Sequence, residues 1–158
     1  MTDKQKDSPQ VNKNIHPSFV ALFYLVVTMI LQRFAPIPFD VTAVGRYIGL
    51  GLTFVGFMLG VGAYLEFRKM RMTLDLYGSV RALVTSGVYR FTRNPIYLGF
   101  FLMVAGFPLN SGSLWGLVVA PFFAMTMSRL VIEKEEAYLE KKFKEEYTAY
   151  KSRVRRWL

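Results

Sequence analysis

An uncharged hydrophobic segment runs without interruption from Tyr47 to Tyr64. A helix that crosses the hydrocarbon core of a bilayer needs about 20 apolar residues, with a range of about 17–25. This segment meets that requirement alone, so it predicts a membrane-spanning helix. It also argues against an ordinary soluble domain, which would be the usual expectation for a chain of 158 residues.

Three further apolar segments are shorter: Ser18–Leu31, extended by Phe34–Phe39, then Pro95–Leu109 and Leu114–Ser128. Each spans a bilayer only with help from tilt or interfacial residues. The turn-forming residues 110–113 between the last two predict a helical hairpin. Two helices of a soluble core are the alternative, but their hydrophobicity is all-round rather than one-sided. We therefore expect an all-α integral membrane bundle of about four transmembrane helices.

Basic residues alternate along the chain in a way that predicts its orientation. Hydrophobic residues make up 53%, yet the net charge is +9. Three Lys or Arg precede the first segment, two follow it, six lie between the second and third, none lies in the hairpin turn, and nine follow the fourth. This alternation predicts a multi-pass protein with both termini in the cytoplasm. We expect residues 1–16 to be a polar cytoplasmic tail and residues 17–158 to be a single membrane domain.

The same charge distribution and the composition exclude several classes of function. The basic residues lie beside membrane segments, where they attract anionic lipid headgroups, so membrane lipids are expected partners and nucleic acid is not. The chain has no cysteine, and its single histidine, His16, stands beside Pro17. We therefore expect no disulfide, no cysteine nucleophile and no metal site. A cleavable signal peptide is not expected, because the first apolar segment starts late.

The connector before the third segment is roughly 25 residues long, which is unusual for a compact fold and makes it a functional candidate. Its last part ends in Arg93-Asn94-Pro95, and Pro95 is typical of the first turn of a helix. Free amides at such a start can bind an anion, with Arg90 and Arg93 beside them. The alternative is that these arginines only mark the cytoplasmic side and reach to the interface.

The stretch after the fourth segment is charged but periodic, which predicts an amphipathic helix at the membrane interface. Its apolar stripe consists of Ile132, Leu139, Phe143, Tyr147, Tyr150, Val154 and Trp157. Glu133, Glu135 and Glu136 follow the fourth segment directly, and we expect that segment to continue into this helix. The glutamates then either bind a cationic ligand group or serve a capping or solvated role.

Glycines recur in the second segment with small-xxx-small spacing. Helix packing is the default explanation. A close approach of the backbone to a cofactor near Gly60 and Gly62 is the alternative. The chain has neither a phosphate-binding loop nor a strand-linked dinucleotide fingerprint.

Three motifs stand in a specific order along the chain. They are Leu83-Val84-Thr85-Ser86-Gly87-Val88-Tyr89, then Arg93-Asn94-Pro95-Ile96-Tyr97-Leu98-Gly99, then Glu135-Glu136 with Phe143, Tyr147, Tyr150 and Val154. Together they resemble the isoprenylcysteine carboxyl methyltransferase and phospholipid methyltransferase superfamily over roughly residues 44–158. The resemblance implies an integral membrane enzyme that uses S-adenosyl-L-methionine, releases S-adenosyl-L-homocysteine and has no Rossmann domain.

The resemblance also assigns roles to residues, and places the cofactor pocket between residues 81–99 and 129–158. The expected cofactor-binding residues are Arg81, Ala82, Leu83, Val84, Tyr89, Asn94, Pro95, Ile96, Tyr97 and Glu135. The expected catalytic residues are Arg93, Asn94 and Glu136. Many relatives have histidine where this chain has Asn94, which cannot titrate. The eukaryotic prenylcysteine enzymes place a substrate-binding arginine where this chain has Val131.

The expected activity is methyl transfer to a lipid-like or membrane-partitioning small molecule at the cytoplasmic interface. Phospholipid N-methylation is one alternative. A non-catalytic membrane scaffold or subunit, in which the charged clusters only pair or bind headgroups, is another. A transporter is disfavoured because no charged residue interrupts the apolar segments. The methyl acceptor, the methylated element and the oligomeric state are left open.

Overall fold

The computed structural model describes residues 16–37, 40–70 and 81–158. The described residues form helices only, as predicted. The elements in chain order are α1 (Pro17–Phe34), α2 (Ala43–Lys69), the 3-10 turn η2 (Gly87–Arg90), α3 (Pro95–Asn110), α4 (Trp115–Met127), the π-helical segment η3 (Ser128–Ile132) and α5 (Glu133–Arg153). The predicted polar tail, apart from His16, and the first part of the connector lie outside the described residues.

Three helices are long and apolar enough to cross a membrane: Pro17–Phe34, Ala43–Lys69 and the continuous helix Trp115–Arg153. The third and fourth predicted segments form the expected helical hairpin. Its first helix, α3, is apolar but shorter than the three candidate spans. Large hydrophobic side chains such as Phe19, Phe54 and Phe122 are exposed on the outer surface. Such a surface suits lipid rather than water. The fold is therefore a multi-pass membrane bundle by length and composition.

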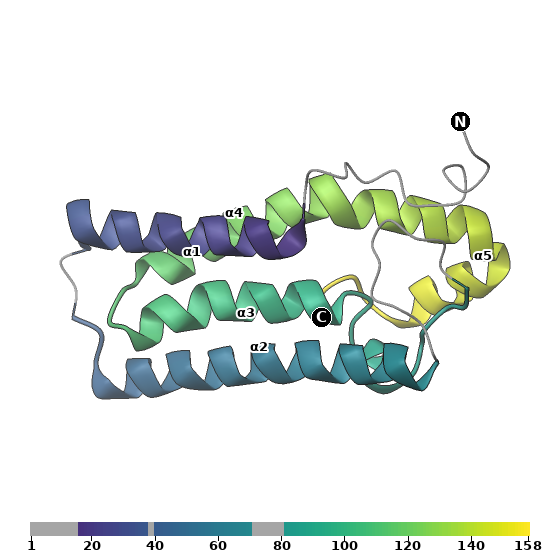
Figure 1. Cartoon of the computed structure of the whole chain (residues 1–158), viewed down its shortest axis with the longest axis horizontal. Helices are drawn as coiled ribbons and strands as arrows, with labels where there is room; N and C mark the ends of the chain where they lie inside the picture. Colours follow the sequence, from purple (N-terminus) through teal and green to yellow (C-terminus); the bar gives the residue numbers. More distant parts are fainter. Residues whose placement is uncertain (1–15, 38–39, 71–80) are drawn as a thin grey trace.

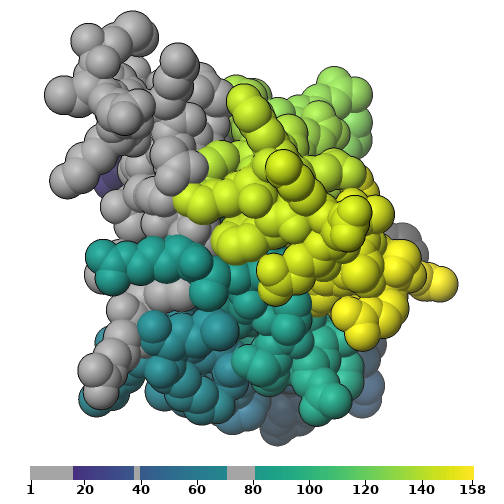
Figure 2. Space-filling view, turned by 90° about the vertical axis from the view of Figure 1, so that its right-hand side faces the viewer, coloured from purple at the N-terminus to yellow at the C-terminus, as the bar shows by residue number. Residues whose placement is uncertain are grey.

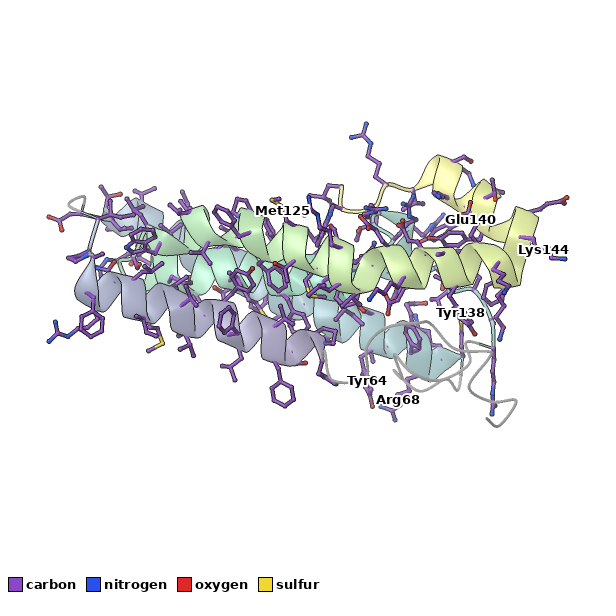
Figure 3. The ribbon with its side chains drawn as sticks, turned by 90° about the horizontal axis from the view of Figure 1, so that it is seen from above. Tyr64, Arg68, Met125, Tyr138, Glu140 and Lys144 are labelled. Carbon is purple, nitrogen blue, oxygen red and sulfur yellow. The ribbon has the colours of Figure 1, made fainter. Side chains whose placement is uncertain are left out.

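The helices lie side by side along the long axis of the molecule (Figure 1). α1 starts, α2 ends, α3 starts and α4 ends at the same end of the bundle, which we call the connector end. The link between α1 and α2 and the turn between α3 and α4 lie at the opposite end. In the view from above, the charged residues Arg68, Glu140 and Lys144 lie toward the connector end, whereas Met125 lies about midway along the bundle (Figure 3).

α2 and α3 pack closely through glycines on both helices. A Cβ atom on Gly49 would lie 2.7 Å from the carbonyl oxygen of Gly106, and one on Gly106 would lie 2.6 Å from that of Gly49. Gly56 and Gly99 face each other in the same way. These backbone contacts confirm the packing explanation for Gly49 and Gly56.

The core under the connector end is built by α4 and η3, whose residues Phe123, Met127, Val131 and Ile132 are fully buried. α1 covers this core through Tyr24. Its ring packs against Phe123 at 5.7 Å in a T-shaped arrangement, and its hydroxyl lies 2.6 Å from that of Thr126. The first helix is thus fixed to the helix that leads into α5.

The C-terminal stretch differs from the single straight helix that the periodicity predicts. α4, η3 and α5 are continuous, as expected, but α5 bends at Lys144, where φ is 45° and ψ is −117°. The helix ends at Arg153, and residues 154–158 are not helical. The apolar stripe continues past this end because Trp157 packs on Phe101 of α3, at a centroid distance of 6.2 Å. The end of the chain therefore returns to the start of α3 (Figure 1).

Candidate functional site at the connector end

The end of the connector and the segment after α5 lie side by side (Figure 2). The backbone amide of Arg93 donates to the carbonyl oxygen of Arg155 at 3.0 Å. The carbonyl oxygen of Arg156 accepts two side-chain hydrogen bonds, from the hydroxyl of Thr92 at 3.1 Å and from Nδ2 of Asn94 at 3.0 Å. We call residues 154–157 the tail segment. Its backbone is thus bound directly to the residues that lead into α3.

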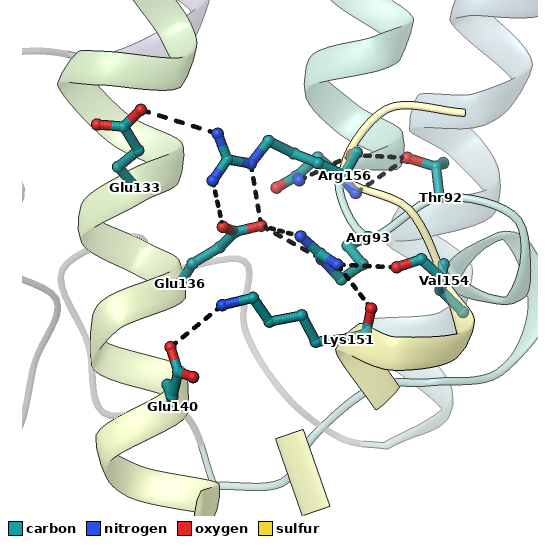
Figure 4. A network of polar contacts seen from close by, with 9 residues as sticks. Thr92, Arg93, Glu133, Glu136, Glu140, Lys151, Val154 and Arg156 are labelled. Atoms are coloured by element: carbon teal, nitrogen blue, oxygen red, sulfur yellow. Dashed lines mark hydrogen bonds and ion pairs between the residues drawn. The ribbon is translucent and has the colours of Figure 1, made fainter. Parts of the chain in front are cut away.

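Glu136, on the first turn of α5, is buried and binds two arginines (Figure 4). Its Oε1 atom lies 2.7 Å from Nη2 of Arg93, and its Oε2 atom lies 2.6 Å from Nη2 of Arg156. Arg156 also approaches Glu133 at 3.8 Å. Hydrogen bonding to Glu136 raises the pKa of Arg156 above its usual value. A buried carboxylate with two guanidinium partners is a compensated charge.

Every side-chain nitrogen of Arg93 has an acceptor within the described residues. Nε and Nη2 donate to Glu136 at 3.2 and 2.7 Å. Nη1 donates to the carbonyl oxygens of Lys151 and Val154 at 3.1 and 2.8 Å. Arg93 therefore joins three elements: the connector, the start of α5 and its end. In this arrangement its guanidinium holds the protein together rather than facing an open space.

Glu135 has a different environment from its neighbour. It is partly buried, and its Oε1 atom accepts a hydrogen bond of 2.9 Å from the hydroxyl of Tyr97 on α3. Across residues 16–37, 40–70 and 81–158, no basic side chain forms an ion pair with it. A carboxylate shielded from water is normally paired with a cation. Glu135 is thus the acidic group of this site that no basic side chain of the described residues neutralises.

The helical path explains why two successive glutamates serve different partners. Neighbouring residues on an α-helix point in directions about 100° apart. The π-helical segment Ser128–Ile132, which precedes them, turns the helix relative to α4. Such segments occur frequently at functional sites. Before the π-helical segment the buried side chains are apolar, as in Phe123 and Met127. After this segment the buried side chain is that of Glu136. Glu135 consequently faces α3, while Glu136 faces the connector and the tail segment.

Tyr89 stands on the 3-10 turn η2 and closes the site from the side of α2. Its backbone carbonyl accepts a hydrogen bond of 2.7 Å from the hydroxyl of Tyr150. Its side chain is buried with Ala63 and Val84. Burial, and next the charge of Glu135, raise the pKa of Tyr89 well above its ordinary value. Its hydroxyl therefore stays protonated near Glu135.

The sequence-predicted residues are not all placed alike. The structure brings Arg93, Asn94, Tyr97, Glu135 and Glu136 together through the contacts above. Pro95 is buried at the first turn of α3. Ile96 packs against the core that contains Phe123 and also against the small apolar cluster that contains Val84 and Tyr89. Ala82 and Leu83 are partly buried beside them in sequence. Arg81 is exposed, and no hydrogen bond or ion pair joins it to this group within the described residues.

Sequence reasoning missed Thr92 and Arg156 as members of the site. Thr92 is buried and binds both the amide of Asn94, at 3.2 Å, and the tail segment. The local sequence around each residue gives no sign of a functional role. Thr92 is a threonine close to Pro95, and Arg156 is one of several basic residues near position 158. The available signal is the group of arginines near the end of the amphipathic stripe, Arg153, Arg155 and Arg156, which charge alternation alone explains as a marker of the cytoplasmic side.

The fold and site define a helical membrane protein whose connector end carries a compensated charge cluster and, beside it, Glu135, which has no basic partner among the described residues. The chain belongs to the phospholipid methyltransferase family, whose family model matches residues 44–146. This confirms the superfamily to which the three motifs point.

Individual relatives match parts of the chain. A protein of Haemophilus influenzae that bears only the name "Uncharacterized protein" is 36% identical over 63 residues, which are 40% of this chain and the whole of that protein. The protein-S-isoprenylcysteine O-methyltransferase of Schizosaccharomyces pombe is 36% identical over 77 residues, or 46% of this chain and 30% of the enzyme. The enzyme of the same name from Saccharomyces cerevisiae is 38% identical over 76 residues, which are 48% of this chain and 32% of that enzyme. The match thus spans about a third of either yeast enzyme. No solved structure matches the chain.

Proposed function

We propose that this protein is an S-adenosyl-L-methionine-dependent methyltransferase that acts on a lipid-like or membrane-partitioning acceptor at the cytoplasmic membrane interface. Family membership and the similarity to two isoprenylcysteine O-methyltransferases support the reaction class. The arrangement of the helix ends supports the location, because the charged site lies at one end of an otherwise apolar bundle. On the cytoplasmic side, such a site receives a water-soluble cofactor from one direction and a lipid from the other.

One observation carries the proposal: Glu135 is shielded, bound by Tyr97 at 2.9 Å, and has no cationic partner among the described residues. The cofactor carries an ammonium, a sulfonium and a carboxylate, and an acidic side chain is the natural partner of the first. Amides of the first turn of α3 suit the carboxylate, since the first N–H groups of a helix have no acceptor within it. Val84, Tyr89 and Ile96 offer an apolar and aromatic surface for the nucleoside.

The remaining predicted catalytic residues receive a positioning role in this proposal. Arg93 and Glu136 bind each other, and Asn94 binds the tail segment. They therefore fix the connector against α5, so that Tyr97 and Glu135 keep their mutual geometry. Holding reacting groups in line contributes about 7–11 kcal/mol to such a reaction when the geometry is maintained. Asn94 does this without a titratable group, which excludes it as a proton relay.

When bound, S-adenosyl-L-methionine supplies an electrophilic methyl group, whose carbon–sulfur bond breaks as the acceptor bonds to the carbon, leaving S-adenosyl-L-homocysteine. Glu135 holds and orients the charged end, and the surrounding helices exclude water. Exclusion of water strengthens the interactions between charges. A carboxylate acceptor reacts without a base. An amine acceptor needs one. Of the acidic side chains Glu133, Glu135 and Glu136, Glu133 is the one to which this proposal gives no other role, and its only ion pair among the described residues is with Arg156 at 3.8 Å.

Phospholipid N-methylation is the second candidate, and the description of the matching family favours it. The test of both is transfer of a labelled methyl group from the cofactor into a total lipid extract by the purified protein, followed by identification of the product. A labelled apolar product without a labelled amine headgroup supports the first candidate, and a labelled amine headgroup supports the second. A protein that neither binds S-adenosyl-L-homocysteine nor labels any acceptor would be a scaffold, and the proposal would be wrong.

A further inference from the structure

Glu66 is a buried acidic residue on the last turns of α2, and the site described above does not include it. Only 7% of its surface is exposed. An ionisable residue in a membrane-crossing helix is costly and usually has a functional partner. α2 is one of the helices long and apolar enough to span the membrane, so the partners of Glu66 call for an explanation.

The two carboxylate oxygens of Glu66 have different partners. Oε2 accepts a hydrogen bond of 2.6 Å from the hydroxyl of Ser86, which lies on the connector. Oε1 pairs with Nζ of Lys69 at 2.6 Å, but the side chain of Lys69 is 70% exposed. An ion pair whose cation lies in solvent contributes less than a buried one. The contact with Ser86 is therefore the one that joins α2 to another element.

The connector is shaped to fit against Glu66. Gly87 has φ of 58°, a conformation that glycine adopts readily, and a Cβ atom there would collide with the Glu66 carboxylate group. One turn earlier on α2, a Cβ atom on Gly62 would lie 2.7 Å from Val88. Glycines on both sides thus allow the connector to lie directly on α2. Contact with the connector therefore explains why glycine stands at position 62.

The residues held by this contact lead directly to the proposed cofactor site. Ser86 and Gly87 start the 3-10 turn that carries Tyr89. The ring of Tyr89 packs against Phe67 on α2 at 6.0 Å. From the other side, the hydroxyl of Tyr150 on α5 donates to the carbonyl oxygen of Tyr89 at 2.7 Å. α2 and α5 therefore hold the two sides of the same turn, and Glu66 is the polar contact on the α2 side.

We propose that Glu66 is a positioning residue for the cofactor site, acting through Ser86 and Gly87 to hold Val84 and Tyr89 opposite Glu135. The proposal rests on the proposed function. It assigns to the cytoplasmic end of α2 a part in cofactor binding. The chemical group that Glu66 recognises is the Ser86 hydroxyl of the chain itself, and Glu66 does not contact the cofactor.

The test measures the affinity of the purified protein for S-adenosyl-L-homocysteine together with its thermal stability. Ser86→Ala deletes the hydroxyl that binds Glu66. A hydrogen bond to a charged group corresponds to a factor of at least ten in an equilibrium, here the one between the held and the released turn, so binding should weaken by up to about tenfold. Glu66→Ala should weaken it at least as much. Combining the two should add little to Glu66→Ala alone, because both remove the same contact.

Two further variants separate positioning from general stability. Glu66→Gln should bind within about threefold of the wild-type protein, since its amide oxygen still accepts from Ser86 and only the weak exposed ion pair is lost. Arg68→Ala removes an exposed charge near Glu66 and is the matched control, with binding unchanged. If Glu66→Ala does not fold, the comparison of Ser86→Ala with Arg68→Ala decides the question.

The outcomes distinguish the two proposals. A wild-type protein that does not bind S-adenosyl-L-homocysteine contradicts the proposed function. A wild-type protein that binds it, with Ser86→Ala and Glu66→Ala binding equally well, overturns the role of Glu66 alone. A loss of affinity that merely follows a loss of thermal stability, and that Glu66→Gln does not restore, overturns it as well.

Discussion

Arg156 and Glu136 are 20 residues apart in sequence, and Nη2 of the first lies 2.6 Å from Oε2 of the second. This contact brings the chain after α5 back to the start of that helix. The same arginine offers its carbonyl oxygen to Thr92 and Asn94. One residue therefore connects the beginning of α5, the connector and the tail segment.

Arg156→Ala should loosen the tail segment and lower both thermal stability and cofactor affinity. A hydrogen bond to a charged group contributes about 1.5–3 kcal/mol, and because the Arg156 side chain is 35% exposed we expect the lower value. Thermal unfolding in detergent and S-adenosyl-L-homocysteine binding measure the two effects. Arg153→Ala is the control, since Arg153 is exposed and, within the described part of the chain, its Nε donates to a carbonyl oxygen of its own helix, that of Ala149. Equal behaviour of the two variants would contradict a special role of Arg156.

Glu136→Gln should reduce stability more than any other single change in the site. It leaves the guanidinium of Arg93, of which only 9% is exposed, without its counter-charge. Removing one partner of a buried ion pair costs about 3–5 kcal/mol. The measurement is the apparent melting temperature. A variant that melts like the wild-type protein would show that the carbonyl oxygens of Lys151 and Val154 satisfy Arg93 alone.

Glu135→Gln should give the opposite result. No cation inside the described chain depends on Glu135, so the melting temperature should stay close to that of the wild-type protein. The affinity for S-adenosyl-L-homocysteine should fall at least tenfold, because the amide cannot neutralise an ammonium group. Calorimetric titration checks this. Unchanged affinity would remove Glu135 from the cofactor site.

The contrast between these glutamates shows how far sequence reasoning could reach. The uncharged apolar segments predicted the membrane helices, because a bilayer imposes length and polarity directly on the chain. The turn residues 110–113 predicted the hairpin. The motif order predicted that the connector and α5 share a site. Which of Glu135 and Glu136 pairs with arginines of the chain depends on the π-helical turn and on Arg156, and no local periodicity encodes either. The bend at Lys144 was missed for the same reason, since the apolar stripe continues across it.

The glycine contacts between α2 and α3 predict a position-dependent effect of alanine. Gly49→Ala should destabilise the bundle by about 1–3 kcal/mol, as added atoms in a tight contact usually do, because its Cβ would meet the backbone of α3. Gly51→Ala should be neutral or stabilising, since no atom lies within 4 Å of its Cβ position and alanine favours helix. Thermal unfolding of both variants in one detergent is the comparison. Similar losses would show that α2 does not pack on α3 in this register.

The orientation of the bundle can be tested with single cysteines, because the chain has none of its own. Ser111→Cys lies in the exposed turn after α3, and Ser152→Cys lies on the exposed side of α5. If the connector end is cytoplasmic, an impermeant thiol reagent added to intact cells should label the cysteine at position 111 and spare the one at 152. Reversed labelling would place the cofactor site on the wrong side of the membrane for a cytoplasmic donor.

The bend of α5 predicts an unusual benefit from glycine inside a helix. Lys144 is the one non-glycine residue with positive φ among those the structure describes. Holding such a residue there costs on the order of 1–3 kcal/mol, whereas glycine adopts this conformation at little cost. Lys144→Gly should therefore raise the melting temperature, although glycine loses about 1 kcal/mol through the freedom of the unfolded chain. Lys144→Ala removes the same charge and keeps the strain, so it should not raise the melting temperature. If alanine stabilised the protein as much as glycine does, α5 would be straight at this position, and the tail segment could not reach Glu136.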